Sequence, residues 1–136
     1  MNIRETLDKI AAKRILVLDG AMGSMIQTFG LTEEDFRGER FAEHTVLVKG
    51  NNDLLSLTQE HIISDIHCQY LEAGADLIET NTFNSTTISL ADYAMADLSY
   101  ELNKAGAELA RKACNLYSTP EKPRFVVGVL GPTSKT

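Results

Sequence analysis

The sequence is poor in the features of secreted and membrane proteins. It has two cysteines in 136 residues, Cys68 and Cys114, whereas secreted disulfide scaffolds carry more cysteines at closer spacing. No stretch approaches the roughly 18 apolar residues of a membrane-spanning helix. The first residues, up to Arg14, include Glu5 and Asp8 and lack the apolar run of a signal peptide. We therefore expect a cytoplasmic location.

Basic residues are also scarce. The chain has 13 Lys and Arg against 19 Asp and Glu, a formal net charge of -6. A surface for nucleic acid or for an anionic membrane needs a basic patch. The acidic residues are scattered, which is typical of a solvated surface. We expect neither a nucleic acid nor a membrane as a partner.

The composition is typical of a globular protein, with 43% hydrophobic residues, and the length of the chain allows one domain at most. Continuous apolar runs predict strands, and apolar residues three and four apart predict helices. We expect Thr58 to cap a helix and Gly74 to end it. Between the predicted helices 22–29 and 59–73 lies a long segment with turn residues and at most short helices, which we call the excursion. The predicted strands are 15–18, 75–83 and 125–130, the helices are 3–13, 22–29, 59–73, 86–96 and 98–116, and the excursion is 31–57.

The alternation of strands and helices predicts an α/β fold with parallel strands. The run at 15–18 is apolar on both faces and predicts a strand covered on both sides. An open doubly wound sheet and a closed barrel both fit the spacing, although a G-x-G-x-x-G dinucleotide turn is missing. Three parallel strands would leave two open edges. We therefore expect a portion of a larger domain, of about 250 residues if it is a barrel.

Each predicted strand ends in polar or turn-forming residues, and the active face of parallel α/β folds lies there. Asp19 and Glu79 would receive an ammonium group, and the amides of the turn after Asp19 would receive a carboxylate. The hypothesis is an amino-acid ligand. The alternatives stay open, because Asp-Gly is a common turn after a strand and Asn81 or Thr133 would equally cap a helix. Met22 is more typical of a core than of a site.

No catalytic or metal-binding set is visible in the sequence. The three histidines, His44, His61 and His67, do not fall at ligand spacing. Cys68 and Cys114 lie inside predicted helices, where buried thiols are the usual finding. A serine–histidine–acid arrangement and a phosphate loop are also missing. We expect no metal site in this chain.

Three motifs in order resemble the homocysteine S-methyltransferase family. They are Leu16-Val17-Leu18-Asp19-Gly20-Ala21-Met22-Gly23-Ser24-Met25-Ile26-Gln27, Ala73-Gly74-Ala75-Asp76-Leu77-Ile78-Glu79-Thr80-Asn81-Thr82-Phe83 and Gly128-Val129-Leu130-Gly131-Pro132-Thr133. The segments 34–41, 49–58 and 84–93 resemble the cobalamin-dependent methionine synthase branch in particular. Any single motif is weak, whereas the ordered set is specific.

The resemblance implies a partial (β/α)8 TIM barrel made of the first three parallel strands with their helices. Residues 1–136 would be the N-terminal portion of a homocysteine-binding barrel domain. The complete enzyme would transfer a methyl group from methylcobalamin, supplied by 5-methyltetrahydrofolate, to zinc-bound homocysteine, giving methionine. Its partners would be homocysteine and the cobalamin and folate domains of the same chain. The family's zinc cysteines lie on later strands, so the chain alone would bind no zinc and would be inactive.

The same resemblance implies roles for individual residues, with none of them catalytic. Asp19 matches the aspartate near the substrate's amino group, and Gly20, Ala21 and Met22 match the turn whose backbone faces the amino acid. Substrate contact or its support is implied for Glu79, Thr80 and Asn81. Gly131, Pro132 and Thr133 match the third strand's end.

Two alternatives accompany this interpretation. The first is a relative that uses betaine or S-methylmethionine as the methyl donor and has no cobalamin. The second is a non-catalytic partial barrel, stable only through self-association or a partner, because its sheet edges are open.

Overall fold

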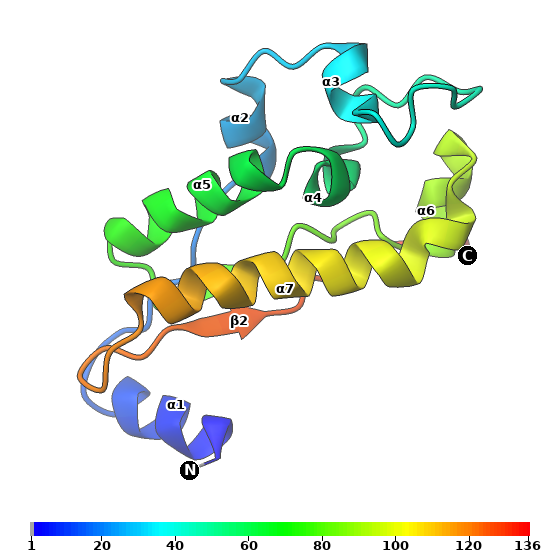
Figure 1. Cartoon of the computed structure of the whole chain (residues 1–136). Coiled ribbons are helices and arrows are strands. Elements are labelled where there is room, and N and C mark those ends of the chain that lie inside the picture. Colours follow the sequence, from blue (N-terminus) through cyan, green and yellow to red (C-terminus); the bar gives the residue numbers. More distant parts are fainter. Residues whose placement is uncertain (1) are drawn as a thin grey trace.

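Three parallel backbone segments run side by side in the computed structural model, which describes residues 2–136 (Figure 1). Strand β1 (Leu77–Glu79) pairs with β2 (Phe125–Val127), and the segment before Asp19 joins the other side of β1 through one bridge between Leu18 and Leu77. The predicted α/β class with parallel strands is confirmed. The described residues form part of such a fold and no closed barrel.

Helices fill the connections that a parallel order requires. The two crossovers contain α5 (Glu60–Glu72) and α7 (Ser99–Tyr117), close to the predicted 59–73 and 98–116. The predicted helices 3–13 and 22–29 are found in shorter form, and the excursion holds only short helices, as expected. The remaining elements are α1 (Ile3–Ala11), α2 (Met22–Gln27), α3 (Glu33–Arg37), η1 (Asn52–Leu54), α4 (Leu55–Thr58), α6 (Thr87–Leu90), η2 (Ala91–Tyr93) and η3 (Ala96–Leu98).

Two helix predictions need correction. Thr58 does not cap α5, because it ends α4 and donates its hydroxyl to the Leu54 carbonyl, while the extended φ of Gln59 separates the two helices. The predicted helix 86–96 is broken, because Ala94 adopts a left-handed φ of 54°. This reversal lets both Leu90 and Met95 point into the core. The helix stop predicted at Gly74 is confirmed by its φ of 110°.

The predicted strand 15–18 is reduced to the bridge at Leu18. The Val17 N–H donates to the Asp76 side chain and not to a backbone carbonyl, so the ladder is interrupted there. Burial on both faces is not found either, since Ile15 is 85% exposed and Val17 and Leu18 are also exposed. The described residues place no strand beyond this segment, and its outer edge stays uncovered.

The other two strands are shorter than the predicted 75–83 and 125–130, because side chains take over from the backbone ladder. The Thr80 hydroxyl accepts from the Val129 N–H at 3.0 Å, and the Thr82 hydroxyl donates to the Val129 carbonyl at 2.9 Å. The two segments therefore stay paired beyond the ends of β1 and β2, through threonine hydroxyls.

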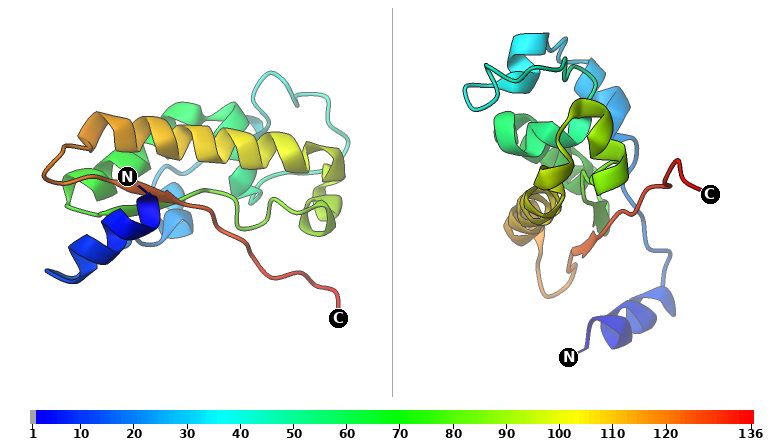
Figure 2. Two further views of the ribbon diagram at one scale, coloured as in Figure 1. Left: turned by 90° about the horizontal axis from the view of Figure 1, so that it is seen from below. Right: turned by 90° about the vertical axis from the view of Figure 1, so that its right-hand side faces the viewer.

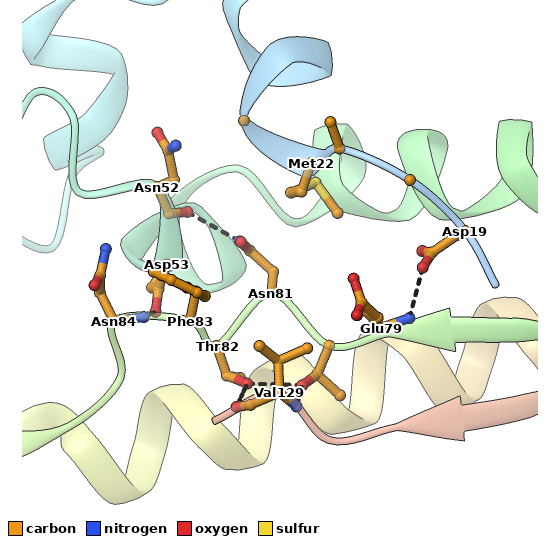
Figure 3. Close-up of a pocket in the computed structure, with 14 residues that line it drawn as sticks. Asp19, Met22, Asn52, Asp53, Glu79, Asn81, Thr82, Phe83, Asn84 and Val129 are labelled. Carbon is orange, nitrogen blue, oxygen red and sulfur yellow. Dashed lines mark hydrogen bonds between the residues drawn. The ribbon is translucent and has the colours of Figure 1, made fainter. Parts of the chain in front are cut away.

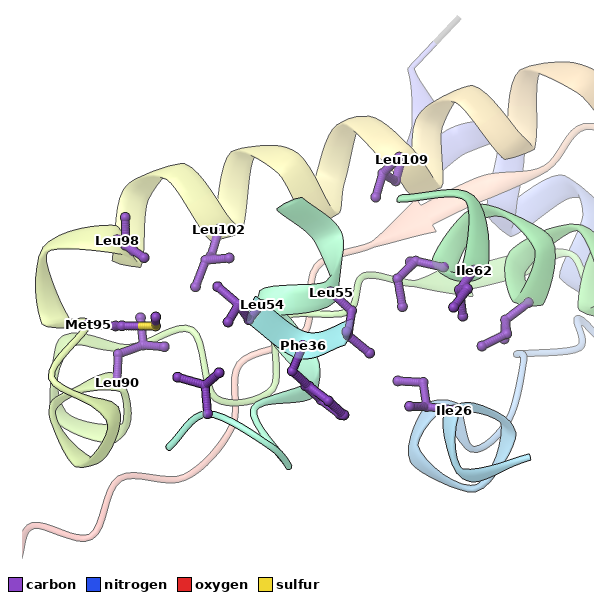
Figure 4. Packing of buried hydrophobic residues seen from close by; sticks show 13 residues of the cluster. Ile26, Phe36, Leu54, Leu55, Ile62, Leu90, Met95, Leu98, Leu102 and Leu109 are labelled. Atoms are coloured by element: carbon purple, nitrogen blue, oxygen red, sulfur yellow. The ribbon is translucent and has the colours of Figure 1, made fainter. Parts of the chain in front are cut away.

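The core consists of two clusters on one side of the sheet. The smaller one packs Ile78 of β1 against Leu71 of α5 and Ala110 of α7. The larger cluster lies between α5, α7 and the excursion (Figure 4), and each fully buried aliphatic side chain contributes about 1.5–3 kcal/mol. Its members are Ile26, Phe36, Val48, Leu54, Leu55, Ile62, Ile63, Ile66, Leu90, Met95, Leu98, Leu102 and Leu109.

Helix α1 stands apart from this core. Asn2 caps its first turn, but none of its residues is buried, and Figure 2 shows it below the sheet, away from the helical layer. Within residues 2–136, no helix has the length and apolar character to cross a bilayer.

The buried carboxylate of Asp76 joins the first segment to β1. Arg14 donates to both of its oxygens, at 2.7 and 2.9 Å, and the Val17 N–H donates to it at 2.9 Å. The hydrogen bond from Arg14 holds the pKa of the Asp76 carboxyl below its usual range. One side chain therefore fixes the chain just before Asp19.

We predict that Asp76→Ala lowers the free energy of unfolding by about 1–3 kcal/mol, because the Val17 N–H and Arg14 lose their buried acceptor. The lowered pKa means that this stabilisation is present above the unfolded-state pKa of about 3.9 and is lost as the pH falls through the lower folded-state value. Urea denaturation at pH 7 and at pH 3 measures both effects.

The matched control is Asp92→Ala, which removes an exposed carboxylate on η2. An equal loss of stability in both variants at pH 7 would contradict the role of Asp76.

Candidate functional site

A cavity of about 560 Å³ opens at the carboxyl ends of the parallel segments (Figure 3). It brings together chain segments that are far apart in the sequence. Its lining consists of residues 19–23, 52–53, 79–84 and Val129. All seven residues predicted for the substrate site, Asp19, Gly20, Ala21, Met22, Glu79, Thr80 and Asn81, lie in this lining.

Asp19 and Glu79 lie side by side at the cavity. The Asp19 N–H donates to the Leu77 carbonyl at 2.9 Å, and the Asp19 carboxylate accepts from the Glu79 N–H at 3.1 Å. Burial raises the pKa of Asp19 to about 6, the hydrogen bond from the Glu79 N–H opposes this, and the Glu79 charge adds to the increase. The two carboxyl groups therefore share a site in which negative charge is poorly compensated.

Among residues 2–136, no cation forms an ion pair with Asp19 or Glu79. The ion pairs among residues 2–136 join Arg14 to Asp76, Arg37 to Glu33, Arg40 to Glu101 and Lys104 to Glu108. None of them includes Asp19 or Glu79. A cationic group that entered the cavity would meet two carboxylates without a competing partner.

The turn after Asp19 is held from α5. The Tyr70 hydroxyl donates to the Ala21 carbonyl at 3.0 Å. Gly20 lies against the same ring, and a Cβ at this position would approach the Tyr70 hydroxyl to 3.2 Å. Met22 is the first residue of α2. It lines the cavity and also packs against the larger core cluster, so it belongs to both the core and the candidate site.

Thr80 and Asn81 are buried and turn their polar groups to the protein. The Thr80 hydroxyl bonds to that of Thr82 at 2.7 Å and accepts from Val129. The Asn81 side-chain amide donates to the Asn52 carbonyl at 2.9 Å and to the Ser56 hydroxyl at 3.4 Å. Both residues support the cavity wall, and neither caps a helix.

The sequence reasoning missed part of the lining. Asn52 and Asp53 come from η1 at the end of the excursion, and Phe83 and Asn84 follow the second strand's polar end. The available signal was the length of the excursion, because long loops in compact domains are often functional. The third strand's end is only partly involved: Val129 lines the cavity, whereas Gly131, Pro132 and Thr133 do not.

The described residues do not fit a metal centre. No group of three His, Cys, Asp or Glu side chains among residues 2–136 could hold an ion. Cys68 on α5 and Cys114 on α7 pack in the smaller core cluster. His67 is completely buried in α5 without a partner for either ring nitrogen, and burial lowers its pKa to about 4.

Parallel strands, helical crossovers and a cavity at the strands' carboxyl ends define part of an α/β domain, in which binding sites lie at these strand ends. Residues 16–136 match the model of the homocysteine S-methyltransferase family, and the chain belongs to that family. The predicted family is thereby confirmed, whereas its cobalamin-dependent branch is not decided by this match.

Two solved structures resemble the chain in fold. Both are of the homocysteine methyltransferase MmuM from Escherichia coli. The oxidized form is 25% identical with a TM-score of 0.72, over 93% of this chain and 40% of that one. The metallated form is 24% identical with a TM-score of 0.71, over 93% and 41%. The chain therefore spans about two fifths of the length of these structures.

We predict that Glu79→Gln lowers the pKa of Asp19 below its wild-type value of about 6, because it removes the neighbouring negative charge. Carboxyl-detected NMR titration measures this pKa in both proteins. With a folded-state pKa raised above about 3.9, protonated Asp19 contributes stability at low pH that is lost as the pH rises through 6. An unchanged Asp19 pKa in the variant would show that the two carboxylates do not interact.

Proposed function

We propose that this chain supplies the amino-acid-binding part of a homocysteine site, as the N-terminal portion of a TIM-barrel methyltransferase domain. The observation that carries the proposal is the pair of carboxylates, Asp19 and Glu79, which line one cavity and form no ion pair with any residue that the structure describes. A ligand ammonium group would compensate their charge. The family membership makes homocysteine the amino acid to test.

In this proposal each predicted residue has a definite role. Asp19 and Glu79 bind the ammonium group, and the backbone of Gly20, Ala21 and Met22 faces the ligand carboxylate. Tyr70 holds that turn through the Ala21 carbonyl. Thr80 and Asn81 act as supports, since their polar groups are occupied by the protein.

The chemistry proposed for the complete enzyme is methyl transfer to the homocysteine sulfur, giving methionine. The described residues do not fit a zinc site. Zinc and cobalamin are assigned in this proposal to other segments of the enzyme, and no catalytic role is proposed for a residue of the present chain. Its contribution is to bind and orient the amino-acid end of the substrate.

Within the family, we propose the cobalamin-dependent methionine synthase branch, with cobalamin and folate domains as partners. The sequence resemblance of 49–58 and 84–93 supports this, and the structure packs these two segments together at Asp53 and Asn84. The segment 34–41, which also resembles that branch, contacts α7 through the Arg40–Glu101 ion pair. A cytoplasmic location and the lack of nucleic-acid and membrane partners stay predictions.

The open edges of the sheet favour the second alternative for the isolated chain, a partial barrel that needs a partner. Ile15 is 85% exposed and Val17 and Leu18 are also exposed on the edge segment, while Leu130, which follows β2, is 91% exposed. Exposed apolar side chains along open edges promote association. This role concerns the isolated chain and is compatible with the enzyme proposed above.

We predict that Asp19→Asn in the complete enzyme weakens homocysteine binding by about 10- to 150-fold, the equivalent of about 1.5–3 kcal/mol for a hydrogen bond to a charged group. The zinc content should be unchanged, because Asp19 is assigned to the ammonium group alone. Isothermal titration and metal analysis measure the two quantities.

The exposed Asp92→Asn serves as the matched control and should bind homocysteine as the wild type does. Loss of zinc with full homocysteine affinity in Asp19→Asn would overturn the assigned role.

We also predict that the complete enzyme converts homocysteine to methionine with methylcobalamin and 5-methyltetrahydrofolate, and not with betaine or S-methylmethionine. Turnover with each donor, followed by methionine formation, decides the branch. Activity with betaine or S-methylmethionine without cobalamin would place the enzyme among the cobalamin-independent relatives.

A further inference from the structure

The short helix η1 is held from two sides by the segment that follows β1. On one side, the Asn81 amide donates to the Asn52 carbonyl at 2.9 Å. On the other side, the Asp53 carboxylate accepts from the Asn84 N–H at 2.8 Å and from the Ser85 hydroxyl at 2.6 Å. Two consecutive residues of η1 are therefore tied to both ends of the segment 81–85.

Asp53 is an unusual acceptor for such a contact, because its side chain is almost completely buried and no cation of the described residues pairs with it. It is 3% exposed and takes part in none of the ion pairs of residues 2–136. Burying a carboxylate is costly unless it is well hydrogen-bonded. The contacts to the Asn84 N–H and the Ser85 hydroxyl are what compensate this burial.

The turn that Asp53 holds is itself anchored to α7. The Ser85 carbonyl accepts from the Ser99 hydroxyl at 2.7 Å and from the Asn103 amide at 2.8 Å. Gly106 lets α7 approach closely, because a Cβ there would lie 2.7 Å from the Thr82 side chain. The turn is therefore fixed on the α7 side, and Asp53 fixes η1 to it.

These contacts form one wall of the cavity. Asn52, Phe83 and Asn84 line it on the η1 side, while Asp19 and Glu79 line the strand side (Figure 3). The position of this wall relative to the carboxylate pair sets the space for a ligand. Asp53 itself also lines the cavity, and the contacts from the Asn84 N–H and the Ser85 hydroxyl both fall on its Oδ2 atom.

We propose that Asp53 is a positioning residue for the amino-acid ligand, acting through the 84–85 turn to hold the cavity wall of Asn52, Phe83 and Asn84 at its distance from Asp19 and Glu79. This inference rests on the proposed function, because it deepens the same homocysteine site. In this role Asp53 acts through the turn, although it also lines the cavity. Its loss would loosen the wall and weaken ligand binding.

The test compares three variants in the complete enzyme. Asp53→Ala removes the acceptor, Ser85→Ala removes one donor, and Asp53→Asn keeps a side-chain oxygen that can accept from the turn. We expect Asp53→Ala to raise the KM for homocysteine about tenfold, with a smaller change in kcat, and Asp53→Asn to restore most of the affinity. The double variant of Asp53→Ala and Ser85→Ala should be no worse than Asp53→Ala, because the two residues act as one unit.

Leu109→Ala is the matched control for general destabilisation. Leu109 is buried in the larger core cluster and does not line the cavity, so its loss should lower the melting temperature without changing the KM for homocysteine. If Asp53→Ala behaves like Leu109→Ala, the residue is merely structural and the proposal is overturned. If Asp53→Ala does not fold, Ser85→Ala still provides a test. An unchanged KM for homocysteine in Ser85→Ala would also overturn the proposal.

The outcome separates this inference from the proposed function. A wild-type enzyme that binds homocysteine and is weakened by Asp19→Asn, but not by Asp53→Ala, would retain the function and exclude the positioning role. A wild-type enzyme that does not bind homocysteine would overturn both. Weakened binding in Asp19→Asn and Asp53→Ala, with rescue by Asp53→Asn, would support both.

Discussion

The carboxylate of Asp76 is the constraint on which the arrangement of the site depends. It lies at the start of β1 and binds both Arg14 and the Val17 N–H, so the first segment is fixed in register with β1. Asp19 follows two residues after Val17, and its N–H continues the pairing by donating to Leu77. The edge segment is exposed along its outer side, and besides this clamp it is held by the backbone hydrogen bonds of Val17 and Asp19 to the start of β1. The position of the cavity's first carboxylate therefore depends on a side chain that lies outside the cavity.

Three aspartates show how environment assigns different tasks to one residue type. Asp76 faces an arginine, which lowers its pKa, and it serves as a clamp. Burial raises the pKa of Asp53, and this carboxylate holds a turn through neutral donors. Asp19 is partly buried beside another carboxyl group, and its pKa is also raised. Asp19 and Asp53 both line the cavity, and of these two only Asp19 has the charge of another carboxyl group, that of Glu79, among the causes of its raised pKa.

The site also requires that neighbouring chain segments approach one another closely. Gly106 admits the Thr82 side chain next to α7, and a Cβ at Gly131 would collide with the Phe83 carbonyl oxygen. The segment 80–84 is therefore confined between α7 and the end of the third segment. Threonine hydroxyls replace the backbone ladder there, which leaves the chain free to turn outward and line the cavity. The wall of the site is thus built from the places where regular strand pairing stops.

The sequence by itself determined the elements whose signals are local. The periodicity of α5 and α7, the stop at Gly74 and the polar residues after each apolar run predicted the α/β class and the cavity residues Asp19 and Glu79. The ordered motifs predicted the family, which the match over residues 16–136 confirms. Tertiary structure alone decided what depends on distant partners. The Asp76 side chain interrupted the first strand, the burial of Leu90 and Met95 broke the helix predicted over 86–96, and Asp53 joined the excursion to the cavity. The physical reason is that periodicity and turn chemistry act over a few residues, whereas the partner of a buried carboxylate lies up to 62 positions away and is selected only when the chain packs.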